Sequence, residues 1–339
     1  MEFLSFDSRT KSLTLKKGEI PVPKPDEVLV KVAYSGICGT DLHIVEGSFP
    51  CKSDGPVTLG HEFSGVVQAI GSKVTVFSVG QKVAVDPNSG CDTCTFCHSG
   101  KYHFCQSGGI HSTIGIFRDG GWASHCVVPE SQVHLVPDGV ELPQASLAEP
   151  LSCLVHGWDI INPVHVGSRV LVIGAGIIGS LWSCLLHLHG QRKSVTVSEP
   201  QAKRRELFGK LGLDYKAVSP TDLKGREFDL AIDCSGSGPA IESAIPLLGR
   251  GGRLCIFGVA SPQAEVKFKP FEAYMKELQI VAVNINPFTF PKALLLLKAM
   301  ADTYLNYEKL GIGVYSLSQY QDALDALKSG VISKAIFKV

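Results

Sequence analysis

The sequence has no excess of charge of either sign, no long apolar run and no leader-like start. Its 339 residues carry 32 Lys and Arg against 32 Asp and Glu, so neither nucleic acid nor an anionic membrane surface is an expected partner. The most apolar helix-like run, residues 293–297, falls far short of the about 20 residues that span a bilayer. The first residues carry no positive charge ahead of an apolar core, so we expect no secretory signal and a cytoplasmic protein.

Cysteine is abundant, with eleven residues, but without a secretory signal we do not expect a disulfide framework. Four cysteines follow the pattern Cys-x2-Cys-x2-Cys-x7-Cys, at Cys91, Cys94, Cys97 and Cys105. Four thiolates so close together make a closed metal site, which is typical of structural zinc. An iron–sulfur cluster is the main alternative, but the bacterial cluster motif has three residues before its last cysteine and a proline after it, whereas this segment has seven and Gln106. The pattern predicts one structural zinc in residues 91–105.

The stretch 170–179, VLVIGAGIIG, has the pattern of a buried strand followed by a glycine-rich turn and a helix. Gly174 permits the tight turn, Gly176 lets the backbone approach a pyrophosphate, and Gly179 lets the helix pack closely on the strand. The free N–H groups and the dipole at the start of the helix favour phosphates. This stretch predicts a dinucleotide-binding fold.

Glu199 ends a second apolar strand, residues 194–198, and lies twenty residues after the last glycine of the turn. A carboxylate at this place accepts hydrogen bonds from the ribose hydroxyls and repels a 2′-phosphate, which favours NAD over NADP. The basic residues 203–205 could instead neutralise that phosphate. We favour the interpretation in which they form the exposed first turn of a helix, with Arg204 against the adenine.

Elsewhere the chain divides into a β-rich part and an α/β part. Strand-like runs at 28–33, 65–70 and 82–85, with frequent turn residues, are typical of a compact β-barrel domain. From Gly167 onward strands alternate with helices, which predicts a parallel sheet with crossover helices. The predicted strands are residues 170–173, 194–198, 229–233 and 253–257. The predicted elements nearer the C-terminus are helices over 291–301 and 319–328 and a strand over 334–339.

A second metal site is indicated by Cys38 and by the adjacent pair His61 and Glu62, twenty-three residues further on. Thiolate, imidazole and carboxylate are zinc ligands, and three protein ligands with one open position characterise catalytic zinc. Glu149, in the sequence LAEPLSC, is a further candidate. Each residue alone is a weak signal, and either glutamate could be the third ligand.

Together these motifs resemble those of the zinc-containing medium-chain alcohol dehydrogenases, and within them the polyol and threonine dehydrogenase branch. The resemblance covers the whole chain and rests on GICGTDLH, GHEFSGVV, the four cysteines, LAEPLSC and VLVIGAGIIG with Glu199. It implies a GroES-like β-barrel catalytic domain over 1–150 and a Rossmann domain with a doubly wound parallel sheet over 151–290. Residues 291–339 would return to the catalytic domain. It also implies NAD, one catalytic and one structural zinc per chain, and a homodimer or homotetramer.

The resemblance also implies roles for single residues. Thr40 and His43 match the positions of the family's proton relay. Asp41 would orient the imidazole of His61 without itself binding the metal. Asn284 and Asn286 give polar character to the substrate and cofactor site. The positions that match family contacts to NAD are Ile178, Arg204, Cys234, Ser235, Gly236, Phe257, Gly258 and Val259.

The implied activity is the zinc-dependent oxidation of a secondary hydroxyl of a polyol to a ketose, with hydride transfer to NAD. Animal sorbitol dehydrogenases carry an Arg-Tyr pair where this chain has Ile285 and Asn286, and a Tyr where it has Ile44. We therefore expect a smaller or differently configured polyol than sorbitol. An amino-alcohol dehydrogenase of the L-threonine type and a non-catalytic nucleotide-binding protein of the same fold are the alternatives.

Overall fold

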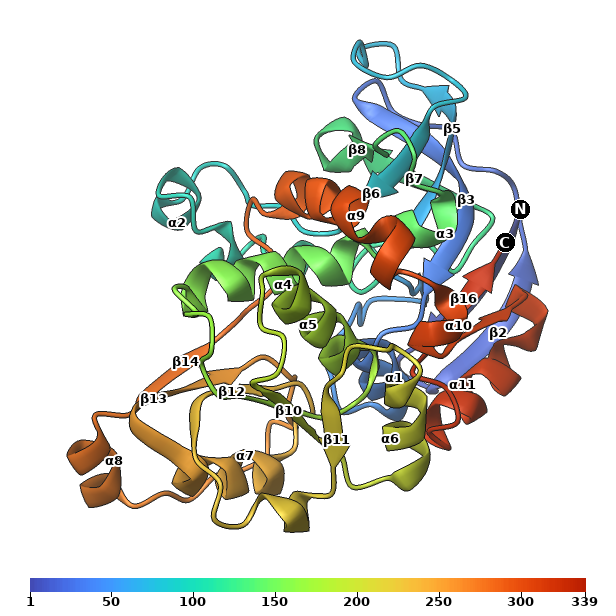
Figure 1. The fold of residues 1–339 in the computed structure, drawn as a ribbon. Helices are drawn as coiled ribbons and strands as arrows, with labels where there is room; N and C mark the ends of the chain where they lie inside the picture. The colour runs from blue at the N-terminus through green and yellow to red at the C-terminus, as the bar shows by residue number, and fades with distance from the viewer.

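A six-stranded parallel sheet organises one half of the computed structural model, which describes residues 1–339 (Figure 1). Its strands run in the order β11-β10-β9-β12-β13-β14, so the sheet grows in both directions from β9. This reversal beside β9 creates the crevice where such sheets bind ligands. The strands are β9 (Val170–Ile173), β10 (Val195–Ser198), β11 (Lys216–Val218), β12 (Phe228–Asp233), β13 (Leu248–Ile256) and β14 (Gln279–Ala282).

The predicted strands of this sheet agree with the observed ones within one residue for β9, β10 and β12. The prediction for β13 was wrong at its start, because the strand begins at Leu248 rather than at residue 253. Its pairing with β12 shifts register between Phe228 and Leu230, and glycines at this irregular start hide the strand pattern. The short edge strands β11 and β14 were not predicted.

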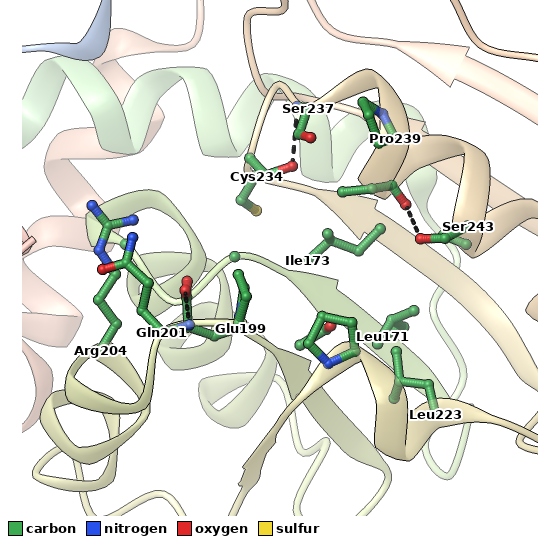
Figure 2. A pocket seen from close by; sticks show the side chains of 18 of the residues that line it. Leu171, Ile173, Glu199, Gln201, Arg204, Leu223, Cys234, Ser237, Pro239 and Ser243 are labelled. Carbon is green, nitrogen blue, oxygen red and sulfur yellow. Dashed lines mark hydrogen bonds between the residues drawn. The ribbon is translucent and has the colours of Figure 1, made fainter.

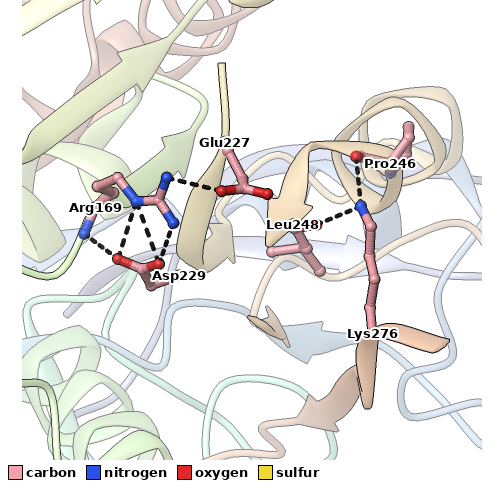
Figure 3. Close-up of polar contacts among 6 residues, drawn as sticks. All are labelled: Arg169, Glu227, Asp229, Pro246, Leu248 and Lys276. Carbon is pink, nitrogen blue, oxygen red and sulfur yellow. Dashed lines mark hydrogen bonds and ion pairs between the residues drawn. The ribbon is translucent and has the colours of Figure 1, made fainter. Parts of the chain in front are cut away.

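Polar contacts hold the starts of β12 and β13 in place (Figure 3). The guanidinium of Arg169, just before β9, donates to the carboxylates of Asp229 and Glu227, and its backbone N–H donates to Asp229 at 2.8 Å. On the neighbouring edge Lys276 of α8 (Pro270–Lys276) donates to the carbonyl oxygens of Pro246 and Leu248, at 3.1 and 2.6 Å. These contacts align the start of β12 with β9 and hold α8 against the start of β13.

The glycine-rich turn after β9 takes the conformation that its sequence predicts. Gly174 has a φ of +100°, which a residue with a side chain rarely adopts. A Cβ on Gly179 would lie 1.9 Å from the carbonyl oxygen of Gly174, whereas a Cβ on Gly176 would meet only open space. The turn is therefore closely packed at Gly179 and accessible to a ligand at Gly176. Helix α5 (Ile177–Leu188) follows directly, and the other helices around this sheet are α4 (Ala148–Ile161), α6 (Ala202–Gly209), α7 (Gly238–Ala244) and α9 (Phe290–Tyr304).

The other half of the molecule contains a seven-stranded sheet and a small three-stranded one. The large sheet has the order β15-β16-β3-β5-β6-β8, with β7 also paired to β3. Its strands are β3 (Glu27–Gly36), β5 (Phe63–Ile70), β6 (Lys82–Val85), β7 (His125–Pro129), β8 (Val133–Leu135), β15 (Ile312–Tyr315) and β16 (Lys334–Lys338). The small sheet has the order β2-β1-β4, with β1 (Glu2–Asp7), β2 (Ser12–Lys17) and β4 (Val57–Thr58).

Strand β16 pairs antiparallel with β3, Ile336 opposite Gly36, so residues from the two ends of the chain share one sheet. Figure 1 shows the red β16 beside the blue β3 and the two termini close together. The remaining helices of this half are short. They are α1 (Gly39–Glu46), α2 (Thr95–His98), α3 (Leu142–Ala145), α10 (Tyr307–Leu310) and α11 (Tyr320–Lys328).

One cluster of 35 buried apolar residues joins the two halves. It contains Val172 of the parallel sheet together with Ala84 of β6 and Ile336 of β16. Helices α4 and α9 lie side by side between the sheets (Figure 1) and contribute Leu151 and Leu297 to the same cluster. None of the helices combines the length and the apolar character needed to cross a bilayer.

Candidate active site

The structure brings Cys38, His61 and Glu62 together between β3, α1 and β5. One donor atom from each lies within 4.8 Å of the others, with His61 and Glu62 buried and Cys38 half-buried. Glu149 of α4 is buried and lines the same cavity, but it is outside this cluster. Its carboxylate accepts a hydrogen bond from the Cys153 thiol at 3.5 Å, and burial raises the pKa of Glu149 to about 7.

Asp41 holds this cluster together without reaching the cavity. It is fully buried at the third position of α1, where its Oδ2 accepts the backbone N–H of Cys38 at 2.8 Å. Its Oδ1 lies 3.4 Å from Nδ1 of His61, which leaves Nε2 of the imidazole for a metal. Asp41 therefore positions two candidate ligands and does not itself contact a substrate.

Lys334 of β16 is a residue that the sequence analysis missed. Its ammonium forms an ion pair with Oε2 of Glu62 and donates to the carbonyl oxygen of Ile37 at 3.3 Å, and both side chains of the pair are only 2% exposed. Gly36 makes room for the pair, because a Cβ there would lie 2.2 Å from Oε2 of Glu62. The only sequence signal was a lysine two residues before Ile336 on one face of a buried strand.

The donor set suits a zinc ion. Burial by itself would lower the pKa of His61, but Asp41 and Cys38 raise it well above its usual value, so this group of side chains attracts positive charge. A thiolate, an imidazole and a carboxylate are ligands that catalytic zinc takes in proteins, with a position left for substrate. The cluster faces a cavity of about 390 Å³, so a substrate could reach that position.

The four cysteines of the predicted structural site also converge. The Sγ atoms of Cys91, Cys94, Cys97 and Cys105 lie within 4.8 Å of one another, and all four are free thiols. The Sγ–Sγ distances from Cys97 are 3.9 Å to Cys91 and 3.5 Å to Cys94, close to the about 3.8 Å edge of a tetrahedral zinc–thiolate site. Backbone N–H groups point at two of the sulfurs, from Cys97 to Cys94 and from Gly108 to Cys105. The cluster fits structural zinc.

Thr40 and His43 line the cavity beside the first metal cluster. They lie three residues apart on α1 and therefore share one face of the helix. Nδ1 of His43 is 3.3 Å from the hydroxyl of Ser48, whose orientation can suit either tautomer of the imidazole. The predicted relay pair is thus adjacent to the metal ligands and reaches toward solvent.

A second cavity, of about 430 Å³, opens at the carboxyl ends of β9, β10 and β12 (Figure 2). It is lined by Gly174, Gly176, Glu199 and Arg204. The carboxylate of Glu199 is buried and accepts the backbone N–H groups of Ala175 at 3.0 Å and of Gln201 at 2.9 Å. Each oxygen keeps a further lone pair for a ligand hydroxyl.

The basic residues after Glu199 do not converge on one anion site. Arg205 donates to the carbonyl oxygens of Glu199 and Pro200, at 2.8 and 2.7 Å, and Lys203 is exposed. Of these three residues only Arg204 lines the cleft, beside Gln201 in Figure 2. This arrangement agrees with the interpretation of residues 203–205 as the first turn of α6.

The two cavities meet at Cys234 and Ser235, which line both. From there Ile178, Asn284 and the segment 257–259 lead to the metal cluster. Gly236 lines neither cavity, and a Cβ there would be 2.3 Å from the carbonyl oxygen of Val259. A dinucleotide extending through both cavities would therefore run from Glu199 to the metal ligands.

Asn286 does not lie where the sequence analysis placed it. Its side chain is fully buried, with Nδ2 donating to Asp86 at 2.9 Å and Oδ1 accepting from Asn88 at 2.7 Å. The backbone turns at Ile285, and the amide of Asn286 is directed toward Asp86 and Asn88 of the catalytic half. Asn88, which the sequence analysis missed, lines the cavity instead, and Thr113 donates to its carbonyl oxygen at 2.7 Å.

Comparisons with known proteins agree with this geometry. Residues 24–138 match the family model described as Alcohol dehydrogenase GroES-like domain, and residues 178–299 match the one described as Zinc-binding dehydrogenase. A sorbitol dehydrogenase of Halalkalibacterium halodurans is 32% identical over 330 residues, covering 93% of this chain and 92% of that protein. An L-threonine 3-dehydrogenase of Caldanaerobacter subterraneus is 36% identical over 261 residues, covering 74% of this chain and 73% of that protein.

Among solved structures, a protein of Sinorhizobium meliloti 1021 classed as a zinc-binding dehydrogenase and solved with NADP superposes with a TM-score of 0.90. It is 31% identical, and the match covers 100% of this chain and 99% of that one. Similarity of sequence and of structure thus extends over both halves of the molecule. The protein belongs to the zinc-containing medium-chain alcohol dehydrogenase family of oxidoreductases.

Proposed function

We propose that this protein oxidises a secondary hydroxyl of a polyol to a ketone, with zinc and NAD as cofactors. The observation that carries the proposal is one cavity in which Cys38, His61 and Glu62 converge beside Thr40 and His43. A non-catalytic nucleotide-binding protein of the same fold has no need of this set, so its completeness favours an enzyme.

In the proposed reaction the alcohol loses a hydride and a proton and becomes a ketone. Zinc held by Cys38, His61 and Glu62 would supply a Lewis acid for the substrate hydroxyl, and NAD would supply the hydride acceptor. We assign the third ligand to Glu62 rather than to Glu149, because only Glu62 belongs to the cluster.

Around that centre, this chain's side chains direct the proton. Thr40 takes the proton of the substrate hydroxyl and passes it to His43, which is half-buried and releases it to solvent. Asp41 holds the imidazole of His61 in one orientation. Ile178 and Phe257 give the nicotinamide end of the cavity apolar walls, which exclude water from the reacting carbon.

We propose NAD rather than NADP as the natural cofactor. The carboxylate of Glu199 is fixed by two backbone N–H groups at the cleft and repels a 2′-phosphate. The solved S. meliloti relative was crystallised with NADP, so this preference is a property to be measured for the present chain.

The cavity favours a polyol over threonine. No lysine or arginine lines it, so the carboxylate of an amino acid would find no guanidinium or ammonium partner there.

The test is a panel of four- to six-carbon alditols, L-threonine and simple alcohols with NAD, following NADH absorbance with and without a zinc chelator. We expect chelator-sensitive turnover of alditols and none of threonine. Thr40→Val should remove most of this activity, and the exposed Thr10→Val serves as the control. Turnover of threonine in preference to every alditol would replace this function with the amino-alcohol alternative.

We also propose that the protein is a homodimer or homotetramer in the cytoplasm. The edge strand β14 is unpaired on one side, and large apolar side chains near it are exposed, among them Phe271, Tyr274 and Ile280. A four-thiolate metal site requires reduced cysteines, which suits a reducing compartment. Light scattering of the wild type and of Ile280→Asp tests the assembly, and cell fractionation tests the compartment.

A further inference from the structure

The lining of the active-site cavity that belongs neither to the metal cluster and relay pair nor to the cofactor side is mostly apolar. The large apolar side chains in this remainder are Phe49, Ile110, Ile116 and Ile285. Its polar residues are Asn88, Thr113 and Asn284. Neither a lysine nor an arginine lines any part of it. A substrate held by its reacting hydroxyl would therefore direct its far end toward hydrocarbon.

The polar side chains in this wall are already engaged with one another. Asn88 donates to Asn286 at 2.7 Å and accepts from Thr113 at 2.7 Å. The Thr113 hydroxyl also lies 2.9 Å from the carbonyl oxygen of Ile110, and Asn284 donates to the carbonyl oxygen of His103 at 3.3 Å. A substrate hydroxyl pressed against this wall would lose its water and gain few partners, which is unfavourable.

Ile285 is held in the cavity wall by a strained backbone. Its φ is +44°, in the left-handed region that β-branched residues avoid. The next residue, Asn286, is anchored by Asp86 and Asn88, so the surrounding structure fixes the strained conformation. Strain of this kind accumulates at ligand sites, and here it holds a branched apolar residue in the lining of the cavity.

Near the metal ligands the lining of the cavity is polar. Thr40, His43 and Glu149 offer polar atoms around the place of the reacting hydroxyl. A hydroxyl on the neighbouring carbon can find partners there, whereas hydroxyls further along the substrate cannot. The lining thus combines a polar group of residues beside the metal ligands with a mostly apolar remainder.

We infer that the preferred substrate is a short, uncharged vicinal diol or polyol whose far end is deoxygenated, ending in a methyl or small alkyl group. This inference rests on the proposed dehydrogenase function and narrows its substrate class. Sugar acids and sugar phosphates are disfavoured because no lysine or arginine side chain lines the cavity to pair with their charge.

The experiment compares matched pairs of substrates in the zinc-loaded enzyme with NAD. Each four-carbon alditol is paired with its 1-deoxy counterpart and with the 2,3-butanediol of the same configuration at the reacting carbon. We expect kcat/KM to be about 10- to 100-fold higher for the deoxygenated member of the best pair, the range that an apolar pocket achieves against an added hydroxyl. Equal or higher kcat/KM for the full alditol in every pair would overturn the inference.

Variants in the wall provide the second arm. Ile285→Asn introduces an amide and a residue that tolerates positive φ, and should shift the kcat/KM ratio at least about tenfold toward the alditol. Ile110→Thr, which replaces an ethyl group with a hydroxyl, should shift the ratio in the same direction and covers the case in which the first variant does not fold. Ile160→Asn, on the exposed end of α4, is the matched control and should leave the ratio unchanged. Unchanged ratios in both wall variants would also overturn the inference.

NAD affinity and zinc content are measured on every variant. If wild-type protein with two zinc ions and bound NAD turns over neither alditols nor diols, the proposed function fails and this inference falls with it. If alditols are turned over but the deoxygenated partners are not preferred, the function stands and only this inference fails.

Discussion

Asp86 shows how a residue outside the reaction can constrain the site. Its carboxylate lies at the end of a chain of hydrogen bonds that runs through Asn286 to Asn88 in the cavity wall. Burial raises the pKa of Asp86 to about 7, although the hydrogen bond from Asn286 acts in the opposite direction. The folded protein therefore retains a proton here at pH values where the unfolded chain has released it.

Stability should respond to this group with a definite sign. Because the folded pKa is raised, the contribution of Asp86 to stability falls as pH rises from about 4 to about 7 and is then constant. Asp86→Asn keeps an oxygen acceptor for Asn286 but does not ionise. We expect the unfolding free energy of the variant to gain about 3 kcal/mol on that of the wild type between pH 5 and pH 8, measured with urea.

The exposed Asp138→Asn is the control for this experiment and should show no such trend. A constant difference between Asp86→Asn and the wild type across this pH range would mean that Asp86 is ionised throughout.

A second prediction for a single residue concerns Glu199. Glu199→Gln keeps the length of the side chain and removes the charge that repels a 2′-phosphate. The ratio of kcat/KM for NAD to that for NADP should fall about 10- to 100-fold, the worth of one or two charge-assisted hydrogen bonds. Glu206→Gln on the exposed side of α6 is the matched control. An unchanged ratio would remove Glu199 from the ribose.

Among the helices and strands, β16 has a role that the sequence did not indicate. It belongs to the sheet of β3, yet its Lys334 places a buried ammonium against the candidate ligand Glu62. Taking two charges out of water is costly, and the pair is tolerated because each charge compensates the other. One strand thereby supports both the sheet and the metal site.

Lys334→Met should destabilise the protein by about 3–5 kcal/mol, because it leaves the Glu62 carboxylate buried without a counter-charge. Urea unfolding should show a larger loss in chelated than in zinc-loaded protein, since a bound cation would share that charge. Lys338→Met, on the same strand but exposed, is the control.

The double variant Glu62→Gln with Lys334→Met should regain most of the lost stability, because no charge then remains unpaired. A double variant as unstable as Lys334→Met would show that the lysine acts by packing alone.

The four-cysteine segment gives another prediction for an element. Cys97→Ser should reduce the zinc content from two ions per chain to one and lower the melting temperature by roughly 5–10 °C, at about 2–4 °C per kcal/mol. Turnover per zinc-loaded molecule at low temperature should change little, because this cluster is separate from the cavity. Cys51→Ser, outside both clusters, should keep two zinc ions. Full thermal stability with lost turnover would contradict a structural role.

The sequence allowed prediction of those features that depend on neighbours in the chain. The glycine-rich turn, the four cysteines and the pair His61–Glu62 are local motifs, and most of the predicted strands follow from apolar runs. The contacts of Lys334 and Asn286 could not be predicted, because Lys334 donates to the carbonyl oxygen of Ile37, 297 residues away, and Asn286 donates to Asp86, 200 residues away. Periodicity indicates which face is buried but not which side chain meets it.

In the whole molecule, one core extends through both halves. The cluster of 35 buried residues includes side chains from the parallel sheet, from β6 and β16, and from α4 and α9 between them. Two-domain proteins often unfold in steps. Here the continuous core makes separate unfolding of either half unfavourable, because it would expose buried apolar side chains of the other half to water.

We therefore expect one calorimetric transition for the zinc-loaded protein, with the calorimetric and van't Hoff enthalpies equal for the cooperative unit. NAD should shift that single transition upward as its concentration rises. Two resolved peaks, of which NAD moves only one, would show that the halves unfold independently.

The ion pair between Lys334 and Glu62 also has a consequence for synthesis on the ribosome. The metal ligands are translated early, but the ammonium that neutralises Glu62 comes from a strand that is made after the whole parallel sheet. A nascent chain that stops short of β16 leaves the edge of β3 unpaired and a carboxylate buried without its partner. Incomplete chains should therefore lack an ordered metal site. They should remain accessible to chaperones and proteases until translation passes residue 334.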